Sequence, residues 1–405
     1  MEQMLSGYKI LDFTHAIAGP TTTLLLAEMG ADVVKVEHPP MGDMMRLAPF
    51  SRNGRSGCYV QHNRGKKSLC IALDQSAGLG IIKKLLPKFD VLIENFSPGV
   101  MKRLELDYET VSAINPRIIM VSISTFGQTG PLANKAGFDG TGAAYTGHVS
   151  RLGEPDRPPD YPQSAAGDVA SGAYAFGAIG YALLHRERTG KGQYIQLSLI
   201  GTYLTFHETA LQSVSASGGA IQCRRTGPDC ELYSPIGSYK GKKAYILIGA
   251  SIQHHFAALA RMIGKPELID DARFKTNDLR AANQKELRGI IEEWISTLSS
   301  DQELISLLDQ HHIPCSPVQT VWEVANDPIL RESGAVKVFT DPIVGEIVVP
   351  GFPIKFGQTQ VNEDLPAAHL GQHNGAVLRE YLDMTGAEID QLQQQGVLYS
   401  KPEGD

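Results

Sequence analysis

The chain has 405 residues and a mass of 43.9 kDa, which is too long for one ordinary hydrophobic core, so we expect two or three domains. Hydrophobic residues make up 42% of the chain and charged residues 20%, which is typical of a globular protein and excludes a disordered one. The net charge of −7 and the pI of about 6.0 argue against nucleic acid as a partner. An anionic ligand must therefore be bound by local basic side chains.

The remaining composition favours a cytoplasmic protein without a membrane anchor. The five cysteines show no CxxC spacing, which suits reduced thiols, and Met1 to Leu5 do not resemble the start of a signal peptide. The apolar run from Val169 to Leu184 is shorter than the ~20 residues that a transmembrane helix needs. No HExxH motif occurs, and the histidine pairs at 254–255 and 311–312 point to different faces, so we expect no metal site.

The first two hundred residues alternate between strands and helices. Strands are expected at 8–13 and 32–37, joined by a helix at 19–29 as a βαβ unit. Further strands are expected at 90–94, 117–123 and 194–199, with helices at 75–86, 108–114 and 169–184. This order predicts a large, doubly wound α/β domain with a parallel sheet. The turn from His15 to Pro20 lacks the GxGxxG pattern of dinucleotide-binding proteins, although the helix that follows it offers an N-terminus for an anion.

The composition changes after residue 212, and we divide the chain there. The large domain is expected at 1–212 and is followed by a Ser-, Gly- and Arg-rich linker at 213–232. A smaller α/β domain follows at 233–315, with a hairpin at 234–249 and helices at 253–263, 283–298 and 301–310. Prolines mark a second linker at 316–370, and helices at 371–405 return to the large domain.

A Gly–Asp pair precedes the longest predicted helix. Gly167 permits a tight turn, and Asp168 is a residue type preferred at the N-cap, so an ordinary helix cap is one interpretation. The surrounding Ala and Gly residues let a ligand approach closely, and the proline-rich loop at 157–162 holds the turn in place, which favours a functional role for Asp168. Gly190 is expected to end the helix.

Polar and basic residues follow several predicted strands, where open α/β sheets bind their ligands. His38 follows one strand, and the segment from Glu94 to Gly99 follows another and leads to Arg103. The basic run from Asn63 to Lys67 either binds phosphate or forms a solvated face. For each of these segments a purely structural role remains the alternative.

Taken in order, these segments resemble the class III CoA-transferases, the family of the formyl-CoA:oxalate and carnitine CoA-transferases. The resemblance covers nearly the whole chain and rests on six segments, at 5–13, 30–37, 63–68, 94–99, 190–193 and 313–318. It implies that Asp168 is the nucleophile. The residues expected to contact CoA are His15, Ala16, Ile17, Ala18, His38, Lys67, Asn95, Phe96, Arg103 and Phe138.

The resemblance further implies an enzyme that moves CoA from an acyl-CoA donor to a free carboxylic acid. Asp168 would form an aspartyl anhydride and then an aspartyl–CoA thioester. CoA enters as a substrate, and no permanently bound cofactor is expected. The family architecture implies an interlocked homodimer whose two chains pass through each other by way of the long linkers.

Three departures limit what the resemblance implies about substrate. Formyl-CoA transferases have glutamine at the position of Ile17 and arginine at that of His38, and they carry a glycine run that is missing between residues 233 and 251. The formate/oxalate substrate pair is therefore not implied. The related α-methylacyl-CoA racemases use a histidine at the position of Phe138, which cannot transfer a proton. A racemase or epimerase, and a non-catalytic acyl-CoA-binding protein, remain the alternative functions.

Overall fold

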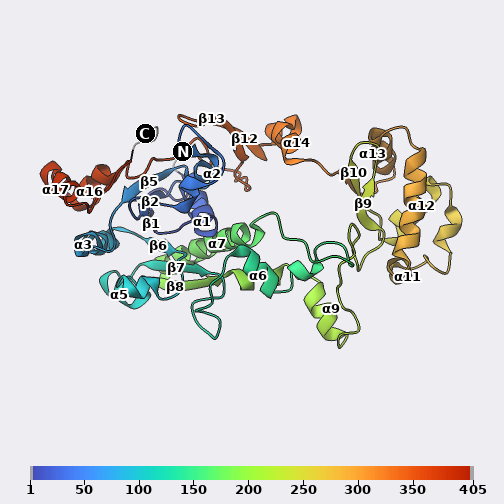
Figure 1. Ribbon diagram of the computed structural model, residues 1–405, viewed down its shortest axis with the longest axis horizontal. Helices are drawn as coiled ribbons and strands as arrows, with labels where there is room; N and C mark the ends of the chain where they lie inside the picture. The colour runs from blue at the N-terminus through green and yellow to red at the C-terminus, as the bar shows by residue number, and fades with distance from the viewer. Residues whose placement is uncertain (1–2, 402–405) are drawn as a thin grey trace. The chain divides into compact units, whose positions relative to one another are not determined.

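The computed structural model describes residues 3–401, which form two compact units (Figure 1). The first unit contains the described residues up to 146, together with 163–206 and those from 328 onward. The second contains 147–162 and 207–327. Within residues 3–401, no helix is long and apolar enough to cross a bilayer.

A six-stranded parallel sheet forms the centre of the first unit, in the order β5-β2-β1-β6-β7-β8. The strands are β1 (Lys9–Asp12), β2 (Asp32–Glu37), β5 (Lys66–Cys70), β6 (Val91–Glu94), β7 (Ile119–Ser124) and β8 (Gln193–Ser198). The chain starts in the middle of the sheet, builds one edge through β5 and returns to build the other edge, as the doubly wound prediction requires. Because all six strands run in parallel, their carboxyl ends share one edge, where ligands bind in such sheets.

Helices cover both faces of this sheet (Figure 1). On one face, α1 (Ala18–Glu28) and α7 (Ala166–Thr189) pack against alternate strand residues such as Ile10 and Ile93. On the other face, α3 (Ser76–Leu85), α5 (Tyr108–Ile114), α16 (Asn374–Leu382) and α17 (Gly386–Gln394) cover the intervening residues, such as Leu11 and Leu92. The near-continuous apolar strands follow from burial on both faces.

Shorter elements complete the first unit. They are α2 (Gly57–Asn63), α4 (Val100–Arg103), α6 (Asp139–Tyr145), α8 (Leu199–Thr205), α15 (Pro328–Ser333) and the hairpins β3–β4 (Ser51–Arg52, Arg55–Ser56) and β12–β13 (Val336–Asp341, Gly345–Pro350). The stretch 316–370, expected to be a linker, thus contains the β12–β13 hairpin as well as helices. Phe339 and Val349 from this hairpin are buried against Tyr59, and such side chains gain stability from a fixed partner that an unstructured linker lacks.

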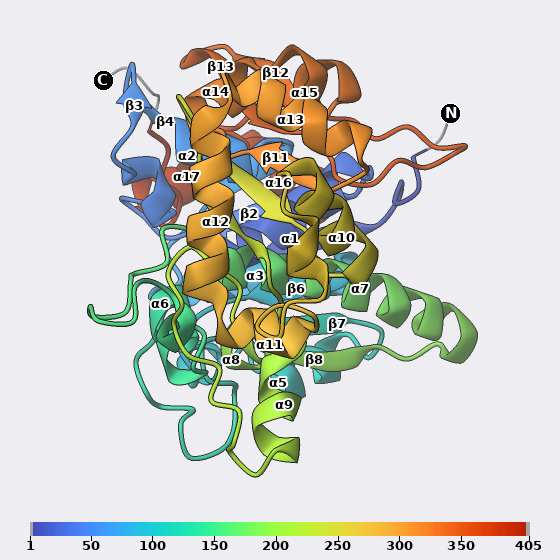
Figure 2. The ribbon, with the colours of Figure 1, turned by 90° about the vertical axis from the view of Figure 1, so that its right-hand side faces the viewer.

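The second unit is built around a three-stranded antiparallel sheet in the order β11-β10-β9. Figure 2 shows helices of this unit, among them α10 (Gln253–Met262) and α12 (Gln284–Thr297). The elements are α9 (Ala210–Ala216), β9 (Ile236–Lys240), β10 (Tyr245–Gly249), α10 (Gln253–Met262), α11 (Asn277–Ala282), α12 (Gln284–Thr297), α13 (Asp301–Gln310), β11 (Cys315–Pro317) and α14 (Val321–Asn326). Phe256 and Ile291 from the helices are buried with Ile248 from the sheet, which confirms the predicted hairpin and helices. Helix α9 extends into the predicted linker at 213–232.

Helices α1 and α7 pack closely at Gly172. A methyl group on Gly172 would lie 2.7 Å from the carbonyl oxygen of Ala18 and 2.8 Å from Cβ of Thr21. The hydroxyl of Thr22 also donates to the carbonyl oxygen of Gly172 at 3.2 Å. Only glycine allows this spacing, because the atom that a Cβ would meet belongs to the backbone and cannot rotate away.

We expect Gly172→Ala to lower the free energy of unfolding by about 1–3 kcal/mol, because α1 and α7 must separate to admit the methyl group. The matched control is Gly80→Ala in α3, where a new Cβ meets nothing within 4 Å. That change should stabilise the helix by about 0.5–1 kcal/mol. Urea denaturation measures both variants, and equal effects of the two would contradict the close packing.

Candidate active site

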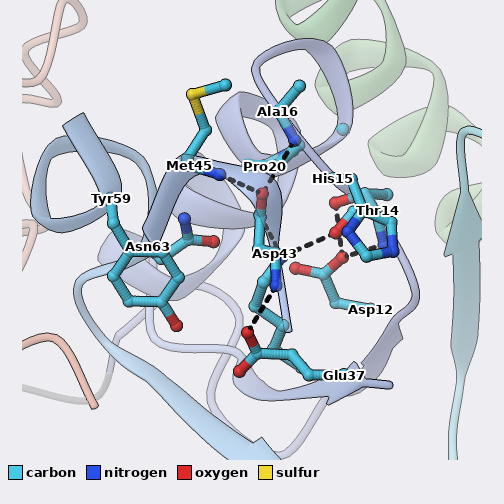
Figure 3. A network of polar contacts seen from close by, with 12 residues as sticks. Asp12, Thr14, His15, Ala16, Pro20, Glu37, Asp43, Met45, Tyr59 and Asn63 are labelled. Carbon is cyan, nitrogen blue, oxygen red and sulfur yellow. Dashed lines mark hydrogen bonds and ion pairs between the residues drawn. The ribbon is translucent and has the colours of Figure 1, made fainter. Parts of the chain in front are cut away.

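A buried charge network lies beneath the turn that follows β1 (Figure 3). Asp12 accepts hydrogen bonds from the N–H and hydroxyl of Thr14 at 2.8 and 2.6 Å and from the hydroxyl of Thr23 at 2.6 Å. Its carboxylate also pairs with Lys66 at 3.2 Å. Burial opposes ionisation, but Lys66, Lys35 and the two hydroxyls outweigh it and lower the pKa of Asp12 to about 2.

The same network fixes the backbone of the turn. Lys35 donates to the carbonyl oxygen of Thr14 at 2.6 Å and pairs with Asp43 at 2.9 Å. Asp43 in turn accepts the N–H of Ala16 at 3.1 Å (Figure 3). Ala16 has a φ of +63°, which costs energy for a residue with a Cβ and persists only where its surroundings impose it. The turn is therefore held in one conformation by buried, ionised groups.

The structure brings together six of the residues expected to contact CoA. The side chain of Asn95, just after β6, accepts the N–H of His15 at 2.8 Å and donates to its carbonyl oxygen at 2.8 Å. The rings of His15 and Phe96 lie 5.4 Å apart, and the turn ends at Ile17, the N-cap residue of α1, followed by Ala18, the first residue of that helix. Burial and the charge of Lys35 lower the pKa of His15, which favours the neutral ring. Residues 15–18 and 95–96 thus form one surface at the carboxyl ends of β1 and β6.

His38 and Arg103 lie at the same edge of the sheet, after β2 and at the end of α4, and both are exposed. Neither side chain makes a hydrogen bond or an ion pair with a residue in the range 3–401. Lys67 is not brought together with them, because it stands at the amino end of β5, opposite Val34. There it pairs with Asp32 and Glu380 at 2.9 Å each.

The other basic residues of the run from Asn63 to Lys67 also form ion pairs within the folded chain. Arg64 is buried in an ion pair with Glu28, and Lys66 is buried against Asp12. These cations neutralise buried carboxylates, so they do not form the phosphate grip or the solvated face that the sequence left open.

We expect Arg103→Ala to raise the Michaelis constant for acyl-CoA by about ten- to a hundredfold, the worth of one lost charge–phosphate contact. The Michaelis constant for the acid acceptor should change much less. Lys67→Ala is the matched control, since it removes a lysine from the opposite edge of the sheet. Steady-state kinetics with each substrate varied in turn measures the difference. A comparable effect of Lys67→Ala would contradict this assignment of the CoA edge.

Asp168 does not cap its helix. Helix α7 begins at Ala166 after the N-cap residue Ala165, so Asp168 lies inside the first turn, and the N-cap interpretation is wrong. Asp139, the first residue of α6, takes the capping role, because its carboxylate accepts the N–H of Asp168 at 2.8 Å. Tyr203 from α8 donates its hydroxyl to Asp139 at 2.6 Å and accepts the N–H of Gly167 at 3.2 Å.

Because Asp139 and Tyr203 bind the N–H groups at the start of α7, the carboxylate of Asp168 has no capping role. Its oxygens make no hydrogen bond or ion pair with any residue from 3 to 401. Burial and the neighbouring charge of Asp139 raise the pKa of Asp168 to about 7, although the N-terminus of a helix favours the anion. A half-buried carboxylate without a partner, with a pKa near neutrality, is suited to react with a ligand.

The edge of the sheet and the loop before Asp139 meet at a small cavity of about 60 Å³. It is lined by Asn95 and Phe96 on one side and by Lys135 and Gly137 on the other. Phe138 follows directly and is 58% exposed. The sequence did not single out Asp139, Tyr203 or Lys135. The Gly137–Asp139 segment could have drawn attention to Asp139, whereas no local sequence pattern points to Tyr203.

Comparison with known proteins decides the family. The model of CoA-transferase family III matches residues 5–374. The chain belongs to this family. It therefore transfers CoA between an acyl-CoA and a carboxylic acid, and the resemblance inferred from the sequence is confirmed.

Relatives of this CoA-transferase match nearly all of its length. It is 34% identical over 397 residues to succinyl-CoA:glutarate CoA-transferase of Mus musculus, which covers 97% of this chain and 90% of that protein. It is 34% identical over 375 residues to acetyl-CoA:oxalate CoA-transferase of Acetobacter aceti, covering 92% and 94% of the two chains. The crystal structure of a CAIB/BAIF family protein from Brucella suis superposes with a TM-score of 0.82 at 32% identity, covering 94% of this chain and all of that one.

Proposed function

We propose that Asp168 is the covalent nucleophile of CoA transfer. The observation that carries the proposal is the unpartnered carboxylate of Asp168, since Asp139 and Tyr203 bind the N–H groups at the start of α7 in its place. A carboxylate without hydrogen bonds keeps its lone pairs available for attack. Gly172, one turn further along α7, contacts Ala18, so this end of the helix lies beside the turn that holds the proposed CoA contacts.

The chemistry proceeds through two covalent intermediates. An oxygen of Asp168 attacks the thioester carbonyl, the C–S bond breaks, and CoA thiolate leaves an aspartyl–acyl anhydride. The thiolate then attacks the aspartyl carbonyl and expels the first product as a free carboxylate, which leaves an aspartyl–CoA thioester. The acceptor acid reverses these steps, so the thioester is conserved and no water is consumed. Water must be kept from the anhydride, which it would hydrolyse.

For the substrates we propose a short-chain acyl-CoA and a short carboxylic or dicarboxylic acid. This rests on relatives, which are named for succinyl-CoA and glutarate and for acetyl-CoA and oxalate. The apolar side chain of Ile17 stands in the turn beside the first residues of α1.

The test is to trap the aspartyl–CoA thioester. The protein is incubated with succinyl-CoA in the absence of an acceptor, freed of succinate by gel filtration, quenched in acid and digested for mass spectrometry. We expect CoA attached to the peptide containing Asp168, and its loss after treatment with hydroxylamine. The proposal is wrong if the same preparations transfer CoA once an acceptor is added, yet CoA is found attached to another residue or to none.

We further propose that the working molecule is a homodimer. The outward face of α7 exposes large apolar side chains, with Val169, Tyr174, Tyr181 and Leu184 exposed by 48%, 49%, 78% and 48%. Apolar residues that recur along one helix face mark an interaction surface. A second copy of the chain covers this face, and the interlocking implied by the resemblance would prevent the two copies from separating.

Sedimentation velocity at nanomolar concentration is therefore expected to show a species near twice 43.9 kDa. The midpoint of thermal unfolding should rise with protein concentration, because two chains unfold together. A monomer that retains CoA transfer on dilution would rule out the interlocked dimer.

A further inference from the structure

A second cavity, of about 430 Å³, lies on the sheet face opposite α1 and α7. It is formed at the carboxyl ends of β6, β7 and β8, where Glu94, Ser122 and Gln196 line it. These residues continue the alternation of Leu92 and Met120, which face α3 and α5. The cavity therefore lies on the other face of the sheet from α7, which carries Asp168.

Glu94 is the most buried of the charged residues that line this cavity. It is 2% exposed, and it makes no ion pair with any described residue. Its carboxylate accepts the N–H of Phe96 at 2.7 Å and a hydrogen bond from Ser122, whose oxygen in turn accepts the hydroxyl of Tyr194 at 3.0 Å. Burial raises the pKa of Glu94 to about 7. A buried carboxylate without a counter-charge is costly, and either protonation or a cationic ligand relieves that cost.

The other charged residues that line the cavity do not neutralise Glu94. Asp107 adds a negative charge and is engaged as the cap of α5, where it accepts the N–H of Thr110 at 3.2 Å. Glu109 and Lys102 are both exposed. Among the lining residues, three carboxylates thus stand against one ammonium group, so the cavity attracts cations.

The walls between Glu94 and solvent are apolar and aromatic. Met101 and Met120 line the cavity, together with the stacked rings of Tyr108 and Tyr194, whose centroids lie 5.1 Å apart. A few polar groups at the base of a largely apolar cavity are typical of small-molecule sites.

We propose that this cavity binds a small organic cation that carries a primary ammonium group on an apolar chain. The ammonium group pairs with Glu94, and the chain packs against the two methionines and Tyr108. The cavity lies on the other face of the sheet from α7, so the proposal does not rest on the role of Asp168.

The test uses n-butylammonium chloride as the probe and 1-butanol as its uncharged counterpart. Calorimetry with the full chain at pH 8 should show saturable binding of butylammonium, with a dissociation constant on the order of 1 mM, as expected for so small a ligand. 1-Butanol should bind at least about tenfold more weakly, because it lacks the charge that pairs with Glu94.

Two variants and a control locate the site. Glu94→Gln keeps the size of the side chain and an acceptor for the N–H of Phe96, and it should weaken butylammonium binding by about tenfold or more. Thr129→Trp, at an exposed position of the lining, should block the cavity while Glu94 stays intact. Glu109→Gln, also exposed, should change binding by less than about twofold. The proposal is overturned if butylammonium does not saturate, if 1-butanol binds equally well, or if either cavity variant binds like the wild type.

Discussion

Asp168→Asn is expected to lower kcat for CoA transfer by about 10³-fold or more, with the fold retained. An amide cannot attack the thioester to form an anhydride, so the covalent route is lost although the side chain keeps its size. Transfer assays and circular dichroism of the same preparations measure rate and fold. Asp74→Asn is the control, because Asp74 is an exposed carboxylate of the same unit without a side-chain partner among the described residues. Turnover by folded Asp168→Asn at the wild-type rate would refute the assignment.

The same substitution is expected to stabilise the protein at neutral pH. The folded-state pKa of Asp168 is raised to about 7 from an unfolded value of about 3.9, so the folded state binds more protons between these values. The stability of the wild type therefore falls as the pH rises from about 4 to about 7, whereas that of the variant lacks this contribution. The difference should grow from near zero at pH 4 to about 1–3 kcal/mol above pH 7, measured by urea denaturation. A variant less stable than the wild type at pH 8 would contradict the raised pKa.

The second large effect concerns pH and Asp139. In the proposed mechanism only the ionised form of Asp168 attacks the thioester, so kcat/KM for acyl-CoA should rise about tenfold per pH unit below the pKa of about 7 and level off above it. At pH 5 the rate should thus be about one hundredth of the plateau. Asp139→Asn removes a negative charge beside Asp168 and keeps an oxygen that accepts the N–H of Asp168. The pKa of Asp168 should therefore fall, and the decline of kcat/KM at acidic pH should move to lower pH.

Tyr203→Phe is the matched control for this shift. It removes the hydroxyl that binds Asp139 and leaves the charge of Asp139 in place. The value of kcat/KM on the high-pH plateau should therefore change, whereas the pKa of Asp168 read from the pH–rate profile should not be lowered. Complete pH–rate profiles of the three proteins measure both quantities. An unchanged limb in Asp139→Asn would show that Asp139 does not set the pKa of Asp168.

The network under the turn at residues 15–18 could be predicted from the sequence only in part. The strand-end positions of His15, His38 and Asn95 followed from the βαβ order, because the ends of parallel strands meet at one edge. The roles of Arg64 and Lys66 did not follow. Each pairs with a carboxylate far away in the chain, Glu28 or Asp12, and a run of basic residues is the same in sequence whether it faces solvent or a buried acid.

By itself, the sequence determined five strands of the parallel sheet, the longer helices of both units and the family, whereas the edge strand β5 and short helices such as α6 and α8 were not expected. The hydrophobic pattern of a strand and the end of a helix at Gly190 depend only on neighbours in the chain. The strands expected from that pattern and the end of α7 at Gly190 lie where they were expected. Only the tertiary structure decided that Asp168 does not cap its own helix. Asp139 and Tyr203 reach the start of α7 from positions 29 and 36 residues away, and their contacts exist only once α6, α7 and α8 are packed. Burial and the charge of Asp139, which set the pKa of Asp168, arise from the same packing and have no local signature.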